Sequence, residues 1–241
     1  MKQYLRSQNL PIRPMWQNLI CSQEHKLSFC PIFKSASTFL LKKFLMISPS
    51  GKYDKETVKV LDGQANSLAR KEFGYLPGWD QYPEFTTKGK TIIFVRHPFE
   101  RILSAFRDKL EDPSLRGARL NEYYYNKYGR RIVMHYRKEK ITGPTYKYPR
   151  FEIRIRWKHF IQLFLFRFSE FIEYILDRDL KYDDEHWGPF FKECTPCQIQ
   201  YNFIGHFETL YWDIHLLANK ANLTQQWDDP NVSLTFCLKF L

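Results

Sequence analysis

Residues 27–45 read LSFCPIFKSASTFLLKKFL, and this stretch decides the fold of the chain. The apolar residues from Leu27 to Phe33 predict a buried strand, and the small polar run from Lys34 to Thr38 predicts a loop. Ser37 or Thr38 is the expected N-cap of a helix, whose apolar residues recur at helical spacing at Phe39, Leu40, Leu41, Phe44 and Leu45. The sequence therefore predicts a strand, a loop and a helix in direct succession.

The same pattern returns at Thr91–Val95, a β-branched run that is typical of a buried parallel strand and ends at Arg96. Pro98 suits a first helical turn, and an apolar stripe follows it at Phe99, Ile102, Leu103, Phe106 and Leu110. Weaker patterns predict helices near 169–176 and 208–221 and a short strand near 202–204, whereas periodicity assigns no element to 115–168. Strands that alternate with helices indicate a three-layer α/β fold, in which helices flank a P-loop-like parallel sheet.

Length and composition suit one domain, because 241 residues with 44% hydrophobic content can bury one substantial core. The 37 Lys and Arg residues outnumber the 26 Asp and Glu residues, and the net charge of +11 attracts polyanions. Charge alone leaves nucleic acid, an anionic membrane and an acidic polysaccharide open as partners. Residues 1–6 lack an apolar signal-peptide core, and charged residues interrupt the most apolar stretch, 160–176, so we expect no membrane anchor in this sequence.

The run from Lys34 to Thr38 is the first candidate anion site. Backbone N–H groups at the start of a helix can surround an anion while Lys34 supplies positive charge, and small side chains let the anion approach the backbone. The run lacks the G-x-x-x-x-G-K-[ST] order of a nucleoside-triphosphate loop. An ordinary polar turn between strand and helix is the alternative interpretation.

Arg96 and Ser104 form the second candidate anion site. Arg96 ends a strand and Ser104 lies two turns into the next helix, so a guanidinium fork and a hydroxyl could hold a phosphate monoester. The alternative is that Arg96 pairs with Glu100 and that Ser104 is only a small helix residue.

Three blocks of the sequence resemble the Golgi carbohydrate sulfotransferases. Residues 33–38, FKSAST, resemble the 5′-phosphosulfate loop of that family, and residues 96–109, RHPFERILSAFRDK, are similar to its 3′-phosphate motif. Residues 184–210 contain DEHW, CTPC and FIGHFETL, which look like segments of the chondroitin, dermatan and HNK-1 sulfotransferase branch. The blocks keep the order of the family across about 27–221.

The resemblance implies the sulfotransferase fold and 3′-phosphoadenosine 5′-phosphosulfate (PAPS) as co-substrate, with no metal ion. It implies that Lys34 is catalytic and neutralises charge on the sulfuryl group, and that Arg96 and Ser104 anchor the 3′-phosphate. The 5′-phosphosulfate is expected to bind at Lys34, Ser35, Ala36, Ser37, Thr38 and Phe39. His186 is the expected general base because it lies in the third block and titrates near neutral pH, and His97 is the second candidate.

The sequence departs from the family pattern in both phosphate blocks. Ala36 stands where many members have Gly, Phe39-Leu40 replaces Asn/Ser-Trp, and His97 replaces the commoner Asp. A non-catalytic glycan-binding form therefore stays open as an alternative to the enzyme, as does a P-loop kinase-like enzyme.

The same resemblance predicts the acceptor, the compartment and the domain limits. We expect a glycosaminoglycan of the chondroitin or dermatan type, or a glycoprotein glycan, and no nucleic acid. We expect a type II membrane protein of the Golgi lumen whose anchor is absent from this chain, with an extension at 1–25 and the sulfotransferase domain at 26–241. In that lumen some of the five cysteines would form disulfides, whose pairing the sequence leaves open, and the sequons at Asn222 and Asn231 could be glycosylated.

Overall fold

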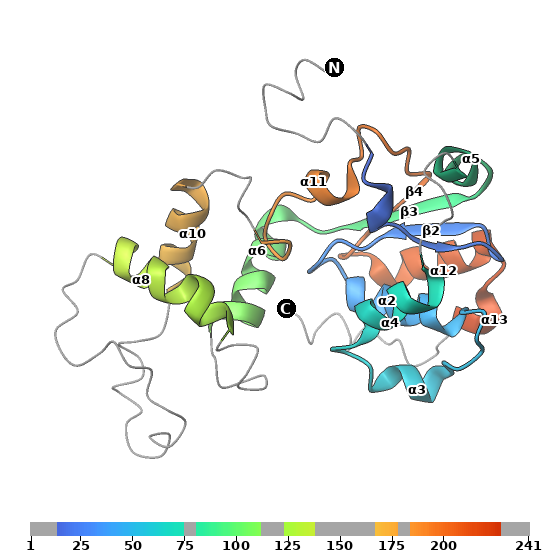
Figure 1. Ribbon diagram of the computed structural model, residues 1–241, viewed down its shortest axis with the longest axis horizontal. Helices are drawn as coiled ribbons and strands as arrows, with labels where there is room; N and C mark the ends of the chain where they lie inside the picture. The colour runs from blue at the N-terminus through green and yellow to red at the C-terminus, as the bar shows by residue number, and fades with distance from the viewer. Residues whose placement is uncertain (1–13, 75–80, 112–122, 138–166, 178–183, 228–241) are drawn as a thin grey trace. The chain divides into compact units, whose positions relative to one another are not determined.

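The computed structural model describes residues 14–74, 81–111, 123–137, 167–177 and 184–227 (Figure 1). These residues form two compact units. The first unit lies within 1–101 and 184–241, and the second lies within 102–183. The first unit contains all the described strands of the chain.

The first unit is built on a four-stranded sheet with the order β1-β2-β3-β4. Its strands are β1 (Ile20–Ser22), β2 (Leu27–Cys30), β3 (Lys90–Val95) and β4 (Phe203–His206). β2, β3 and β4 are parallel, and β1 adds an antiparallel edge. Parallel neighbours require a crossover through other elements, so the predicted α/β architecture is confirmed, including strands at the sites expected from residues 27–33, 91–95 and 202–204.

Helices cover both faces of the sheet (Figure 1). Successive strand side chains point to opposite faces, so Phe29, Ile92 and Phe203 face one core and Cys30 and Ile93 face the other. The first face packs against α2 (Ser37–Met46), α4 (Ala65–Phe73), α12 (Leu210–Ala221) and α13 (Thr224–Trp227), with α3 (Lys55–Lys59) beside them. The second packs against α5 (Gln81–Lys88), α11 (Phe191–Cys194) and residues near the short 3-10 helix η1 (Trp16–Asn18). Three layers result, as the sequence predicted.

A disulfide between Cys30 and Cys194 joins β2 to α11 across 164 residues of sequence. Among the described cysteines, Cys21 is a buried thiol and Cys197 is an exposed one, and Cys237 lies outside the described residues. Cys194 and Cys197 therefore do not pair with each other, although they have C-x-x-C spacing. The bond fixes α11 to the sheet and restricts the unfolded chain.

The second unit is helical in its described part. It begins within α6 (Pro98–Phe106) and continues through η2 (Arg107–Glu111), η3 (Tyr125–Gly129), α8 (Arg130–Tyr136) and α10 (Phe168–Asp177), which confirms the helix expected near 169–176. Its core is aromatic, with the rings of Phe106 and Phe171 5.7 Å apart. A buried ion pair between Arg137 and Glu170, 2.6 Å apart, joins α10 to the end of α8. In the part of the chain described, no helix is long and apolar enough to cross a membrane.

Gly205→Ala tests how tightly β3 and β4 pack. Gly205 lies opposite Phe94 in the sheet, and a methyl group at Gly205 would overlap the buried ring of Phe94. Overpacking of this kind costs about 1–3 kcal/mol of unfolding free energy, measured from urea denaturation. Gly63→Ala is the control, because a methyl group there meets no atom within 4 Å. Equal stability of the two variants would show that β4 can shift to accommodate the side chain.

Candidate functional site

The run from Lys34 to Thr38 follows β2 at its carboxyl end, as predicted, but only Lys34 to Ala36 form the loop, because Ser37 and Thr38 are the first residues of α2. Lys34 and Ala36 both have left-handed backbones, with φ of 70° and 62°. Each such non-glycine residue costs roughly 1–2 kcal/mol, and strain of this kind concentrates at functional sites. The prediction of a Ser37 or Thr38 N-cap is wrong, because the turn at Ala36 starts α2 at Ser37 and makes Ala36 the cap residue.

The loop presents several hydrogen-bond donors at one place. Ser35 is buried, and its hydroxyl has no hydrogen-bond partner in the described part of the chain. Leu40 donates to the carbonyl oxygen of Ala36 at 3.0 Å, so the amides of Ser37 and Thr38, at the start of α2, have no acceptor one turn back in the helix. An unpaired buried hydroxyl costs about 1–3 kcal/mol. A bound anion would satisfy both sets of donors.

Arg96 lies beside this loop at the end of β3. Its guanidinium donates to the Lys34 carbonyl oxygen at 3.3 Å and to the Glu100 carboxylate at 3.4 Å, and it stacks on the ring of Phe207 at 4.0 Å. The ion pair with Glu100 is the alternative considered from the sequence. Glu100 is 47% exposed, and such pairs are weak, typically about 0–1 kcal/mol. The contact of Arg96 with a phosphate stays a prediction, as does that of Ser104, which is half-buried on α6.

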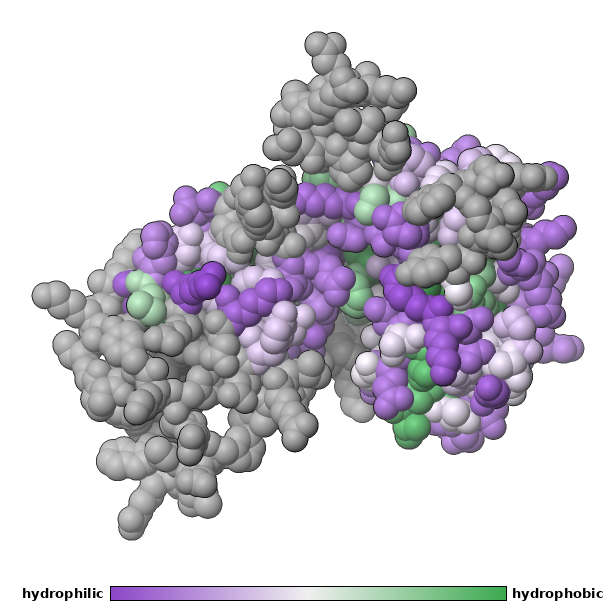
Figure 2. Space-filling view, viewed as in Figure 1, coloured by the Kyte–Doolittle hydropathy of each residue, from purple (hydrophilic) through white to green (hydrophobic). Residues whose placement is uncertain are grey.

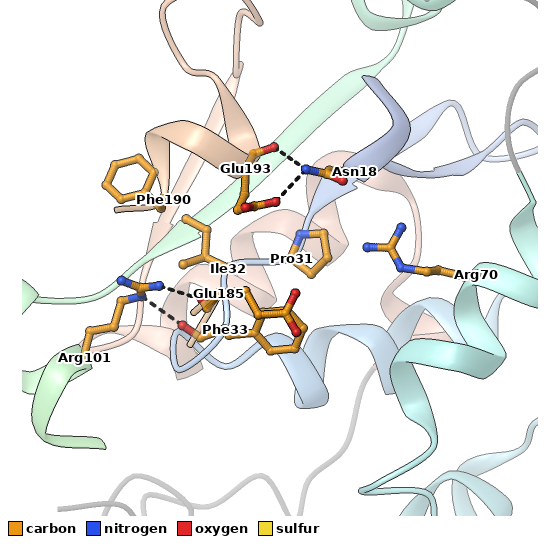
Figure 3. Close-up of a pocket in the computed structure, with 9 residues that line it drawn as sticks. All are labelled: Asn18, Pro31, Ile32, Phe33, Arg70, Arg101, Glu185, Phe190 and Glu193. Atoms are coloured by element: carbon orange, nitrogen blue, oxygen red, sulfur yellow. Dashed lines mark hydrogen bonds between the residues drawn. The ribbon is translucent and has the colours of Figure 1, made fainter. Parts of the chain in front are cut away.

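Arg101 is a site residue that sequence reasoning missed. It is buried, and its guanidinium donates to the carbonyl oxygens of Phe33 at 2.9 Å, Gly188 at 2.9 Å and Glu185 at 3.2 Å (Figure 3). Burial lowers its pKa to about 10, so it remains charged at neutral pH. Arg101 lies on the opposite side of α6 from the predicted apolar stripe, so hydrophobic periodicity gave no signal for its burial.

His186 lies next to the same loop. Its Nδ1 is 2.6 Å from the Asp184 carboxylate, which also accepts from the His186 backbone amide at 3.1 Å. Its ring is buried and lies 4.8 Å from the ring of Phe33. A carboxylate that holds one ring nitrogen orients an imidazole for proton transfer. Asp184 lies only two residues before His186 in the sequence, so this carboxylate could have been predicted as the partner of the imidazole.

His97, the second candidate for the base, is exposed at the start of α6. Its backbone amide donates to the Glu208 carboxylate at 2.8 Å, and its ring lies 5.7 Å from that of Phe99. In the first unit, Arg96 donates to the Lys34 carbonyl oxygen, and the ring of His186 packs on Phe33, the residue before Lys34. Among the described contacts, none brings the ring of His97 to the loop. Within the described ranges, no group of three or more His, Cys, Asp or Glu side chains could hold a metal ion.

A pocket opens beside the loop, and its lining includes Phe33, which precedes Lys34, and Glu185, which precedes His186 (Figure 3). Pro31 and Phe33 follow the end of β2, and Arg70 comes from α4. The remaining lining residues are Asn18, Ile32, Arg101, Phe190 and Glu193. Charged groups of both signs and two phenyl rings therefore face one space.

Comparison with known proteins agrees with this arrangement. A model described as the sulfotransferase family matches residues 17–236. Carbohydrate sulfotransferase 11 of Rattus norvegicus is 26% identical over 216 residues, which are 86% of this chain and 54% of that protein. Carbohydrate sulfotransferase 9 of Homo sapiens is 28% identical over 222 residues, with 86% and 42% covered. Carbohydrate sulfotransferase 8 of Mus musculus is 34% identical over 143 residues, with 55% and 28% covered.

The chain spans about half the length of the curated relatives it matches. No solved structure matches it. The family match covers most of the chain and includes β1 to β4, the phosphate-binding candidates and the His186 segment. By its sequence and its α/β architecture, this chain belongs to the sulfotransferase family.

Proposed function

We propose that this protein is a carbohydrate sulfotransferase that moves the sulfuryl group of PAPS to a hydroxyl of a glycan of the chondroitin or dermatan type. One observation carries the proposal. Arg101 donates at once to Phe33, before the loop, and to Glu185 and Gly188, on either side of His186. An anion-binding loop and an oriented imidazole are thereby held next to each other.

PAPS supplies an activated sulfuryl group, and its transfer resembles phosphoryl transfer in depending on position and charge stabilisation. The Ser35 hydroxyl and the amides of Ser37 and Thr38 bind the 5′-phosphate. Lys34, half-buried at the start of the loop, stabilises the charge that develops during transfer. The left-handed turns at Lys34 and Ala36 set the direction of the loop before any ligand binds.

Arg96 anchors the 3′-phosphate, with Ser104 as the second donor. Its pair with the half-exposed Glu100 is weak, so a phosphate dianion can replace that carboxylate. The ring of Phe207 and the Lys34 carbonyl hold the guanidinium at the end of β3 throughout. This arrangement makes the nucleotide site selective for a 3′-phosphorylated ligand.

His186 accepts the proton of the acceptor hydroxyl. Asp184 fixes the ring through Nδ1, which leaves proton transfer to Nε2, and it would stabilise the imidazolium that forms. Phe33 packs on the ring and ties its position to that of Lys34. His97 is the second candidate for this role.

The Golgi lumen is the proposed compartment. The Cys30–Cys194 disulfide suits an oxidising compartment. Asn222 of the first sequon is exposed at the end of α12, while Asn231 lies outside the described residues. The charge of +11 favours an acidic polysaccharide as acceptor.

The function is tested with labelled PAPS, a panel of desulfated glycosaminoglycans and neutral glycans, and two salt concentrations. We expect transfer to chondroitin or dermatan, with an acceptor KM that rises with salt because exposed charges are screened beyond about 8–10 Å. Nucleotide binding without transfer to any acceptor would indicate the non-catalytic form. Nucleotide binding that requires Mg²⁺ and prefers ATP would indicate a kinase-like enzyme.

Lys34→Ala should lower the rate of sulfate transfer by roughly 10²-fold or more, the usual loss when one group that stabilises transition-state charge is removed. Thermal unfolding should change little, because alanine keeps a Cβ at this left-handed position and the lysine is only half-buried. Lys52→Ala, at an exposed position, removes the same charge as a control. Transfer at the wild-type rate would remove Lys34 from the mechanism.

Arg96→Ala should weaken binding of adenosine 3′,5′-bisphosphate at least tenfold, since a hydrogen bond to a charged group contributes about 1.5–3 kcal/mol. Adenosine 5′-phosphate should bind the variant and the wild type with similar affinity in calorimetry. Glu100→Gln should keep or increase affinity for the bisphosphate, because it removes the competing carboxylate. Equal weakening of both nucleotides by Arg96→Ala would place Arg96 outside the 3′-phosphate site.

A further inference from the structure

The pocket beside the loop contains a cation that is held in place without a carboxylate. Arg70 on α4 donates from Nε to the Asn66 side-chain oxygen at 3.2 Å and from one terminal nitrogen to the Gln17 carbonyl oxygen at 3.3 Å. No carboxylate among the described residues lies within ion-pair distance of Arg70. Two neutral acceptors therefore position its guanidinium while its charge stays uncompensated by an ion pair.

Glu185 is the complementary group of the pocket. Its backbone carbonyl is held by Arg101, and its carboxylate makes no hydrogen bond or ion pair with any residue that the structure describes. Burial, together with the carboxylates of Asp184 and Glu193, raises the pKa of the Glu185 carboxyl, while His186 and Arg70 act in the opposite direction. Glu193, on the far side of the pocket, is occupied by the side-chain amide of Asn18 at 2.9 Å. Glu185 is thus the acceptor in the pocket that remains available to a ligand.

These groups match the chemistry of an acidic sugar. A guanidinium fork recognises a carboxylate, a carboxylate side chain accepts hydrogen bonds from hydroxyls, and phenyl rings pack against the apolar faces of a pyranose. Phe33 and Phe190 supply such rings, and Arg70 and Glu185 supply the two polar groups (Figure 3). A nucleotide phosphate is a poorer fit, because its second negative charge would be repelled by Glu185 and Glu193 more strongly than the single charge of a sugar carboxylate.

The pocket lies next to the two residues proposed to act in sulfuryl transfer. Phe33 directly precedes Lys34, and Glu185 directly precedes His186. A sugar bound there would lie next to both groups that the proposed transfer uses. We propose that this pocket binds one uronic acid residue of the acceptor glycan, with the sugar carboxylate on Arg70 and sugar hydroxyls on Glu185, a subsite that rests on the transferase function proposed above.

Binding of two unsulfated chondroitin hexasaccharides tests the subsite by calorimetry, one native and one with its carboxylates reduced to primary alcohols. Arg70→Gln should weaken the native hexasaccharide about tenfold or more, the effect of losing a charged hydrogen bond, and should barely change the reduced one. Lys71→Gln is the matched control, since it removes the same charge from the adjacent exposed position on α4. Both hexasaccharides should bind this control as they bind the wild type.

Glu185→Gln provides a second test that does not disturb the anchoring of Arg70. It should weaken both hexasaccharides alike, because the hydroxyls are present in each. Failure of the wild type to bind the native hexasaccharide, or equal affinity of the wild type and Arg70→Gln for it, would overturn the subsite. A wild type that shows the expected binding pattern but transfers no sulfate would instead overturn the transferase function and leave the subsite in place.

Discussion

The guanidinium of Arg101 is the constraint on which the rest of the site depends. One buried guanidinium donates to three carbonyl oxygens from two segments, around Phe33 and Glu185, that lie 152 residues apart in sequence. A buried cation is tolerated only when its donors are satisfied, so the segments around Phe33 and Glu185 cannot separate without leaving that charge unpaired. The proposed anion loop, the imidazole of His186 and the pocket between them share this anchor.

The parallel sheet explains why these segments meet at all. β2 and β3 run in the same direction, so the loop after β2 and the turn after β3 emerge at one edge. Arg96 then reaches the Lys34 carbonyl across that edge. The Cys30–Cys194 disulfide adds a covalent tie on one face and fixes the segment that follows His186. The side chains of the candidate site therefore lie on loops that a rigid core supports.

Arg96, directly after β3, and Arg101, on α6, differ in the groups that surround each guanidinium. Arg96 pairs with a half-exposed carboxylate and stacks on Phe207, a weak pairing that is consistent with the phosphate contact proposed for it. Arg101 bonds only backbone carbonyls in the described structure, which no ligand anion would replace without unfolding the loop. Five residues of sequence separate a group suited to binding from one suited to support.

The sequence by itself determined the parallel strands β2, β3 and β4 and the helices α2, α6, α10 and α12, because hydrophobic periodicity and loop composition are local properties. It also located Lys34, Arg96 and His186 through three short motifs. It did not reveal the edge strand β1 or the helices α3, α4, α5, α8, α11 and α13. Tertiary structure alone decided the contacts of Arg101 and Arg70, because each guanidinium reaches a backbone carbonyl that is distant in sequence. It likewise decided that Cys194 pairs with Cys30 and that Ala36 starts α2 in a left-handed turn. Partners of this kind are set by the packing of the sheet, which no local pattern encodes.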